Sequence, residues 1–129
     1  MYICVDFDGT IVDHRFPDIG APVPGAIEWL KQFRKAGALI ILFTMRSDGR
    51  EYGNVLSAAV DYLEKKGVKL FGVNENPDQL EWTSSPKSYG NLYIDDSAVG
   101  CPLIHPEGFY RPCVDWEAVG KMVIEKLGI

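Results

Sequence analysis

Hydrophobic and polar positions follow two different patterns along the chain. Short, nearly continuous apolar runs predict strands at residues 2–7, 38–44, 69–73 and 91–95. Segments whose apolar residues recur at helical spacing predict helices at residues 26–36, 51–66 and 115–127. The run at 38–44 is the most apolar of the four, which is typical of a strand buried on both faces of a parallel sheet.

The order of these elements predicts the fold class. Strands that alternate with helices favour a three-layer α/β domain with a doubly wound, Rossmann-like and mostly parallel sheet. The 129 residues contain no internal repeat, low-complexity tract or linker, so we expect one domain over residues 1–129. In such sheets ligands bind beyond the carboxyl ends of the strands, where the strand order reverses. The polar residues that end each strand are therefore the first candidates for chemistry.

Carboxylates gather at these strand ends. Asp6 and Asp8 close the first predicted strand, and Asp95 and Asp96 close the fourth. Each pair has a simpler interpretation, because Asp-Gly is a strong hairpin signal and the second pair could end its strand in a solvated turn. A hairpin at the first pair does not explain the second pair, however. If the two strands are neighbours, the carboxylates converge and recruit a cation, and oxygen ligands without His or Cys favour Mg²⁺.

Three further polar residues are candidates for binding an anion. Thr44 ends the most apolar strand, where its hydroxyl can donate to an anionic oxygen or serve a structural role. Lys87 lies in a polar loop before the fourth strand, where most lysines are simply solvated; its competitor Lys69 begins a strand and should face the opposite end of the sheet. Arg46 could pair with a substrate anion or orient an acidic neighbour.

Taken together and in order, these residues resemble the motifs of a known superfamily. The chain is similar to the haloacid dehalogenase superfamily, whose four motifs are matched by Asp6-Phe7-Asp8-Gly9-Thr10, by Thr44, by Lys87, and by Asp95-Asp96 after Tyr93-Ile94. The resemblance covers the chain from residue 6 to residue 96, and its first motif is the most specific. It implies a Mg²⁺-dependent phosphoryl transfer through an aspartyl-phosphate.

The resemblance also implies a role for each matched residue. Asp6 would be the nucleophile, and Asp8 would protonate the leaving oxygen and later activate water. The metal would be held by the Asp6 carboxylate, the Asp8 backbone carbonyl and Asp95, with Asp96 helping directly or through water. The phosphate oxygens would be held by Thr44, Lys87 and the backbone N–H groups around Asp8 and Gly9.

The intervals between the motifs leave no room for the cap domain that members of this superfamily often carry. Residues 8–44 hold a loop and one predicted helix, and residues 44–87 hold a helix, a strand and a loop. We therefore expect a capless core, in which loops, the substrate or a second subunit must exclude water. A homo-oligomer would be one way to complete such a site. His14, in the flap that follows the first motif, could touch substrate or lie on the surface.

Composition narrows the partners and the location. Eighteen acidic residues against thirteen basic ones give a net charge of −5, which argues against a broad nucleic-acid surface. A small phosphorylated substrate remains compatible if a metal supplies positive charge. The longest purely apolar run, residues 38–43, is far shorter than the ~20 residues that cross a bilayer. With no visible secretory leader and no disulfide or zinc spacing among its cysteines, the chain is expected to be cytoplasmic.

The leading hypothesis from the sequence is a phosphatase that hydrolyses a phosphate monoester, such as a sugar phosphate or a nucleotide. The alternatives are a phosphotransferase, a non-catalytic phospho-acceptor similar to a two-component receiver, and a binding protein that keeps the metal site without catalysis. In receivers the acidic pair comes first and the phosphorylated Asp later. The order here is the reverse, which favours the enzyme.

Overall fold

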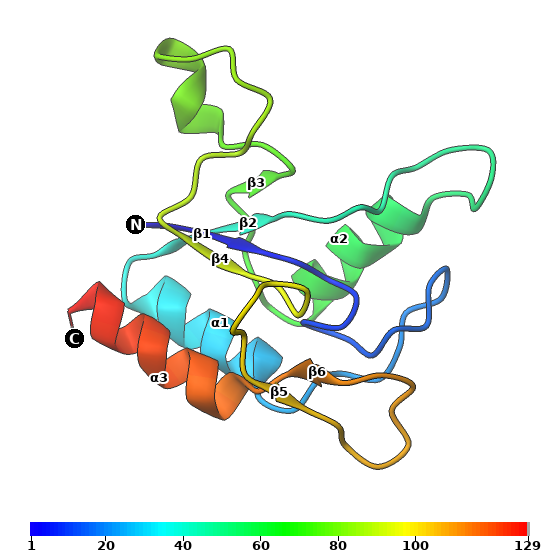
Figure 1. Cartoon of the computed structure of the whole chain (residues 1–129). Coiled ribbons are helices and arrows are strands. Elements are labelled where there is room, and N and C mark those ends of the chain that lie inside the picture. The colour runs from blue at the N-terminus through cyan, green and yellow to red at the C-terminus, as the bar shows by residue number, and fades with distance from the viewer. Residues whose placement is uncertain (129) are drawn as a thin grey trace.

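The computed structural model describes residues 1–128 and is built around a four-stranded sheet (Figure 1). Its strands are β1 (Tyr2–Val5), β2 (Leu39–Leu42), β3 (Gly72–Val73) and β4 (Leu92–Ile94). All neighbouring strands are parallel, and their order is β3-β2-β1-β4. The predicted α/β fold class with a Rossmann-like parallel sheet is therefore confirmed.

The strand order reverses between β1 and β4. From β1 the chain moves to β2 and β3 on one side, and then crosses back to place β4 on the other side of β1. The register pairs Val5 with both Leu42 and Ile94, so the carboxyl ends of β1, β2 and β4 lie level. Sheets of this kind bind ligands at such a reversal. The residues that follow Val5 and Ile94 occupy this position.

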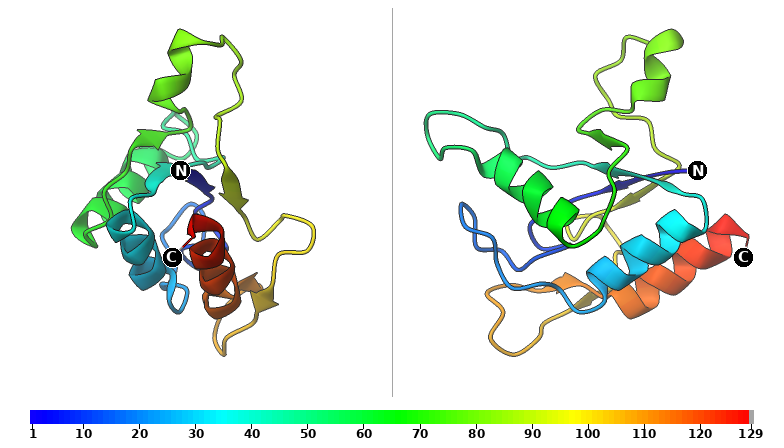
Figure 2. Two further views of the ribbon diagram at one scale, coloured as in Figure 1. Left: turned by 90° about the vertical axis from the view of Figure 1, so that its left-hand side faces the viewer. Right: turned by 180° about the vertical axis from the view of Figure 1, so that it is seen from behind.

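Three α-helices lie on one face of the sheet, α1 (Ala26–Lys35), α2 (Val55–Lys65) and α3 (Trp116–Leu127), as the left view of Figure 2 shows. Val5 and Ile40 point to this face and share one buried cluster with Leu30, Leu63 and Val119, one residue from each helix. Apolar residues at helical spacing face this cluster in each helix, which is why the hydrophobic pattern located all three.

The opposite face is covered by residues 74–91, which contain the 3₁₀ helix η1 (Pro77–Glu81) and no α-helix. The Ser88 hydroxyl lies 3.6 Å from the Cys4 thiol, and the Ser88 carbonyl accepts a hydrogen bond from the Tyr93 hydroxyl at 2.7 Å. The buried Gln79 side chain holds the segment together by donating to the Lys87 carbonyl and accepting from the Tyr89 N–H. The connection from β3 back to β4 must cross this face to be right-handed.

The helix predicted at residues 51–66 begins later, at Val55. Gly49 and Gly53 exchange backbone hydrogen bonds of 3.1 and 3.0 Å, so the residues before the helix form a turn. Asp48 accepts from the backbone N–H groups of Leu56 and Ser57 at 2.9 and 3.0 Å. The predicted start at residue 51 was wrong because the carboxylate that caps the helix comes from the preceding loop.

A second, two-stranded antiparallel sheet was not predicted from the sequence. It consists of β5 (Leu103–Ile104) and β6 (Cys113–Val114). The Val114 N–H donates to the Gly9 carbonyl at 3.1 Å, which fastens this sheet to the loop after β1. Two-residue strands are too short to show a periodic pattern.

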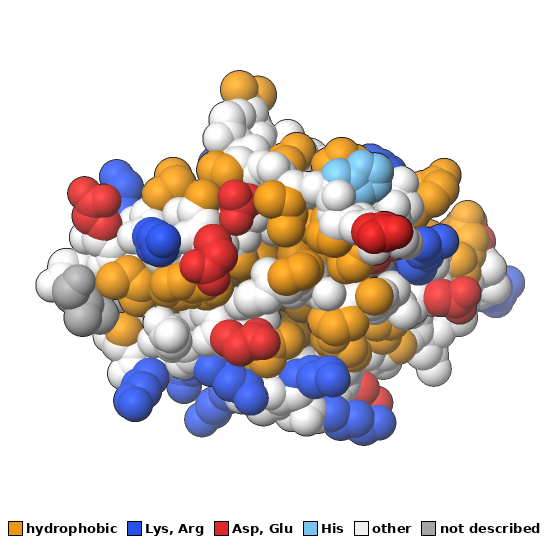
Figure 3. Space-filling view, turned by 90° about the horizontal axis from the view of Figure 1, so that it is seen from below, with side chains coloured by type: hydrophobic (Ala, Val, Ile, Leu, Met, Phe, Trp, Pro, Cys, Tyr) orange, Lys and Arg blue, Asp and Glu red, His pale blue; other side chains and the backbone are white. Residues whose placement is uncertain are grey.

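The surface below the sheet, on the side of α1 and α3, carries charges of both signs. Lys and Arg side chains gather along one margin of this face, while carboxylates and hydrophobic side chains occupy much of the rest (Figure 3). Within residues 1–128, no helix is both long and apolar enough to span a membrane.

The packing of α1 against α3 depends on a glycine. A Cβ atom at Gly120 would overlap the indole ring of Trp29. We therefore expect Gly120→Ala to lower the free energy of unfolding by about 1–3 kcal/mol through overpacking, although alanine is the better helix former. Urea denaturation should show no such loss for the exposed neighbour in Lys121→Ala, and equal stabilities of the two variants would contradict this account.

Candidate functional site

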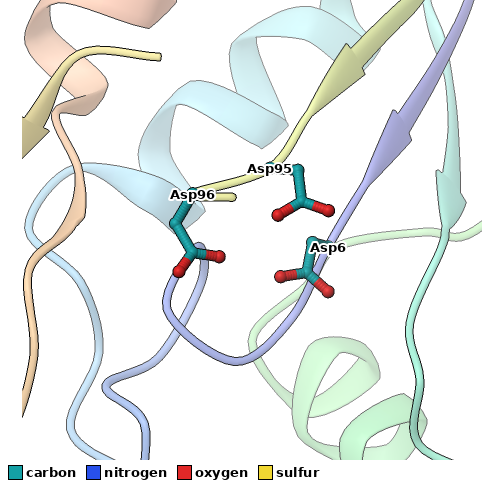
Figure 4. Close-up of side chains that lie close together, drawn as sticks. All are labelled: Asp6, Asp95 and Asp96. Carbon is teal, nitrogen blue, oxygen red and sulfur yellow. The ribbon is translucent and has the colours of Figure 1, made fainter. Parts of the chain in front are cut away.

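Three carboxylates converge where the strand order reverses. Asp6 follows β1, and Asp95 and Asp96 follow β4; one oxygen of each lies within 4.8 Å of the others (Figure 4). The Asp6 N–H donates to the Ile94 carbonyl at 3.0 Å, which continues the strand pairing up to the site. The parallel register of β1 and β4 therefore brings together residues that are about ninety positions apart in the sequence.

The environment of Asp6 opposes its ionisation. Burial, the charge of Asp95, and both the hydrogen bond and the charge of Asp96 raise the pKa of Asp6 from 3.8 to about 8, against the lowering effect of the Phe7 N–H. A cation between the carboxylates would reverse this effect by favouring the charged form. Full ionisation of the three carboxylates is therefore unfavourable unless a positive charge lies beside them.

Two side chains from the loop after β1 contact Asp96 and position its carboxylate. The buried Thr10 hydroxyl lies 3.4 Å from Asp6 Oδ2 and 3.3 Å from Asp96 Oδ1, and it accepts the Asp96 N–H at 3.2 Å. His14 Nε2 lies 2.9 Å from Asp96 Oδ2, with 20% of the His14 side chain exposed. From the sequence, His14 could either contact the substrate or lie on the surface. In the structure it contacts the carboxylate of Asp96.

Asp8 does not join the three carboxylates but pairs with Arg46. Its two oxygens accept from Nε and from one terminal nitrogen of Arg46, each at 2.8 Å. The guanidinium also donates to the carbonyls of Pro17, Asp18 and Val55. All five of its N–H groups are therefore used inside the protein. Arg46 ties the Asp8 loop to the flap and to the start of α2.

Two of the predicted substrate contacts need correction. The sequence allowed Arg46 either to contact a substrate anion or to orient an acidic neighbour; its side chain is 1% exposed and donates to Asp8 and backbone carbonyls, which fits the second role. Gly9 was expected to donate its N–H to phosphate, but that N–H is bound to the Val12 carbonyl at 2.7 Å. Gly9 has a steric role instead: at φ +83°, a Cβ atom there would overlap His14 and Asp96.

Thr44 follows β2 and lies beside the carboxylates. Asn74 accepts the Thr44 N–H at 2.7 Å, and the Thr44 hydroxyl oxygen accepts the Arg46 N–H at 3.1 Å, which leaves its own hydrogen available for an anion. Thr44 lines a pocket of about 210 Å³ together with the carboxylates Asp6, Asp8, Asp95 and Asp96 and with His14, Met45 and Ser97.

Lys87 stands apart from the carboxylates. Its ammonium lies over the Tyr93 ring, 5.5 Å from the ring centre, and it lines a different pocket together with Trp82 and Tyr89. Tyr93 also lines a second pocket that includes Asp6 and Asp95, so this residue borders both the Lys87 pocket and the carboxylate cluster. The predicted role of Lys87 as a phosphate ligand stays a prediction.

Comparison with known proteins places the chain in a family. No model of a known protein family and no curated protein matches it. The solved structure of a conserved protein coded by a locus from Bacteroides thetaiotaomicron aligns with a TM-score of 0.77 and 34% identity, over 98% of this chain and 91% of that one. The chain belongs to the family of that conserved protein. That protein shares the α/β fold described above.

The raised pKa of Asp6 predicts how stability depends on pH without metal. The folded state binds a proton at Asp6 between about pH 4 and pH 8 that the unfolded state has lost, so stability falls as pH rises through this range. Asp6→Asn removes the titrating group and with it this loss of stability at high pH. Urea denaturation with a chelator should show that Asp6→Asn gains at least about 1 kcal/mol more at pH 8 than at pH 5. An equal gain at both pH values, or the same behaviour in the exposed control Asp61→Asn, would contradict the assignment.

Arg46 should be the most sensitive polar residue for stability. We expect Arg46→Met to lose about 3–5 kcal/mol of unfolding free energy, because it leaves the Asp8 carboxylate and three carbonyls without their donors. The exposed Arg50→Met, in the neighbouring turn, is the matched control and should change little. A similar small loss for both variants in thermal or urea unfolding would show that Arg46 does not hold these loops.

Proposed function

We propose that the protein is a Mg²⁺-dependent phosphatase that hydrolyses a phosphate monoester through an aspartyl-phosphate on Asp6. The observation that carries the proposal is the convergence of Asp6, Asp95 and Asp96 at the strand reversal. The resemblance of the motifs to the haloacid dehalogenase superfamily supplies the reaction. The alternatives of a phosphotransferase and a receiver-like phospho-acceptor differ in what removes the phosphoryl group from Asp6.

The residues fit a hard divalent cation. The donor set consists of carboxylate oxygens, and one oxygen from each of the three aspartates can reach a common point. Asp6 and Asp95 would ligate it directly, and Asp96 would do so directly or through water, because Thr10 and His14 already contact its oxygens. When bound, Mg²⁺ would offset the repulsion between the Asp6 carboxylate and an anionic phosphate.

The chain's own residues would divide the reaction as follows. An Asp6 oxygen attacks phosphorus while the bond to the ester oxygen breaks, and Asp8 gives that oxygen a proton. Water then attacks phosphorus, Asp8 takes the proton of the water, and phosphate leaves with Asp6 regenerated. Arg46 would fix the position of Asp8 at the pocket wall, and the free hydroxyl hydrogen of Thr44 would donate to a phosphate oxygen.

The decisive experiment measures inorganic phosphate released from a panel of phosphate monoesters, with Mg²⁺ and with a chelator. We expect release only with Mg²⁺, and a loss of at least about 1,000-fold in Asp6→Asn, because the nucleophile is gone. The exposed Asp61→Asn should match the wild type. Full activity of Asp6→Asn would refute the mechanism, and a stable phosphorylated Asp6 without turnover would favour the receiver-like alternative.

Lys87 provides a second test of the motif assignment. If its ammonium moves past Tyr93 to a bound phosphate, Lys87→Met should lower kcat/KM by about 100-fold or more, as loss of a charge-stabilising donor does. Lys69→Met is the control, because Lys69 lies with Arg34 and Leu39 at the other end of the strands. Unchanged kinetics in Lys87→Met would remove this lysine from the site.

A further inference from the structure

An exposed aromatic pair stands beside the candidate site. Phe16 in the flap and Tyr52 in the turn before α2 pack edge to face, with ring centres 4.9 Å apart. The contact leaves 43% of Phe16 and 58% of Tyr52 open to solvent. Two large rings from separate loops that meet without being buried present an apolar surface outside the core.

This pair is joined to the site through Arg46. The Phe16 ring lies over the guanidinium, 5.2 Å from its central carbon, and the same guanidinium holds both oxygens of Asp8. Met45, which is 97% exposed, lines the same pocket as Asp8. Phe16, Met45 and Tyr52 together are called the aromatic rim below.

We propose that the aromatic rim binds a planar ring in the organic part of the substrate. The inference rests on the proposed function, in which Asp8 gives a proton to the leaving oxygen. The leaving group must then lie against Asp8, and the rest of its organic part extends toward the side chains around Asp8. Met45 lines the pocket that contains Asp8, and Phe16, which packs against Tyr52, lies over the guanidinium that holds Asp8, so the partly exposed rings of the rim are within reach for stacking with a flat ring.

The chemistry of the rim favours a ring over a second anionic group. Every N–H of Arg46 is already used, so the guanidinium beneath Phe16 offers no donor to a carboxylate or another phosphate. The same bonds fix the flap backbone at Pro17 and Asp18, next to Phe16, so stacking there costs little ordering entropy. The substrate class is a phosphate monoester whose aromatic or heteroaromatic ring is a few atoms from the ester oxygen.

A matched pair of substrates tests this proposal. A nucleoside 5′-monophosphate and ribose 5-phosphate carry the same sugar phosphate, but only the first carries a ring. We expect kcat/KM to be about 10-fold or more higher for the nucleotide, as expected from stacking of one base. Tyr52→Ala, and Phe16→Leu as a second variant that keeps an apolar side chain, should lower this ratio several-fold.

The control is Trp82→Ala, which removes an aromatic side chain that is 64% exposed on residues 74–91, away from the rim. It should leave the ratio at the wild-type value. The proposal that the rim binds a ring would be refuted by equal kcat/KM for the two substrates. It would also be refuted by a ratio that falls in Trp82→Ala and not in Tyr52→Ala. Neither result would contradict the proposed phosphatase activity.

A second measurement separates failure of the rim from failure of the proposed function. If neither substrate nor p-nitrophenyl phosphate releases phosphate, the phosphatase is refuted. Calorimetric titration of the wild-type protein with each substrate, in the presence of Mg²⁺, then tests the rim alone. Tighter binding of the nucleotide by about 10-fold, lost in Tyr52→Ala, supports the rim. Equal binding of the two compounds, or no binding of either, overturns it.

Discussion

The crowding of negative charge at the strand reversal is the constraint on which the local structure depends. Asp6, Asp95 and Asp96 come close together because the register of β1 with β4 leaves them level. Burial of Asp6, together with the nearby charges of Asp95 and Asp96, opposes its ionisation and raises the pKa of Asp6 to about 8. Without metal, this arrangement lowers the free energy of unfolding at pH values where the unfolded chain has an ionised Asp6. A less crowded set of side chains would avoid this loss. A cation held between the carboxylates, as proposed above, would offset this cost by favouring their charged form.

The surroundings of the cluster limit this cost in two ways. Thr10 and His14 contact Asp96 from the loop after β1, and the absence of a side chain at Gly9 leaves space for the contact between His14 and Asp96. Asp8 is kept out of the cluster altogether, because Arg46 binds both of its oxygens. Of the four acidic side chains at this edge of the sheet, three could share a bound cation. The fourth, Asp8, is paired with the buried guanidinium of Arg46.

The sequence predicted those parts of the fold and site that follow from periodicity and strand direction. The helix layer was predicted because residues such as Leu30 and Leu63 recur at helical spacing, and Asp6 and Asp95 could be placed together because parallel strands end at one edge. Residues 74–91 could not be predicted, because that layer is held by bonds from Gln79 to backbone groups and not by an apolar stripe. For Arg46 the sequence allowed the orientation of an acidic neighbour, but it could not single out Asp8 or the bonds to carbonyls, because the four partner residues come from three separate segments of the chain.

The wall beside Asp8 in the candidate site is built from loops, and loops are ordinarily the least ordered part of a domain. Here the flap and the turn before α2 are ordered from beneath by one buried side chain, since Arg46 binds carbonyls of Pro17, Asp18 and Val55 while it holds Asp8. The group that positions the proposed acid therefore also positions the wall next to it. A shift of these loops would therefore disturb the hydrogen bonds of the side chain that holds Asp8. A surface tied to the reacting groups in this way is well placed to discriminate between leaving groups, because a poorly fitting one would disturb the acid as well as the contact.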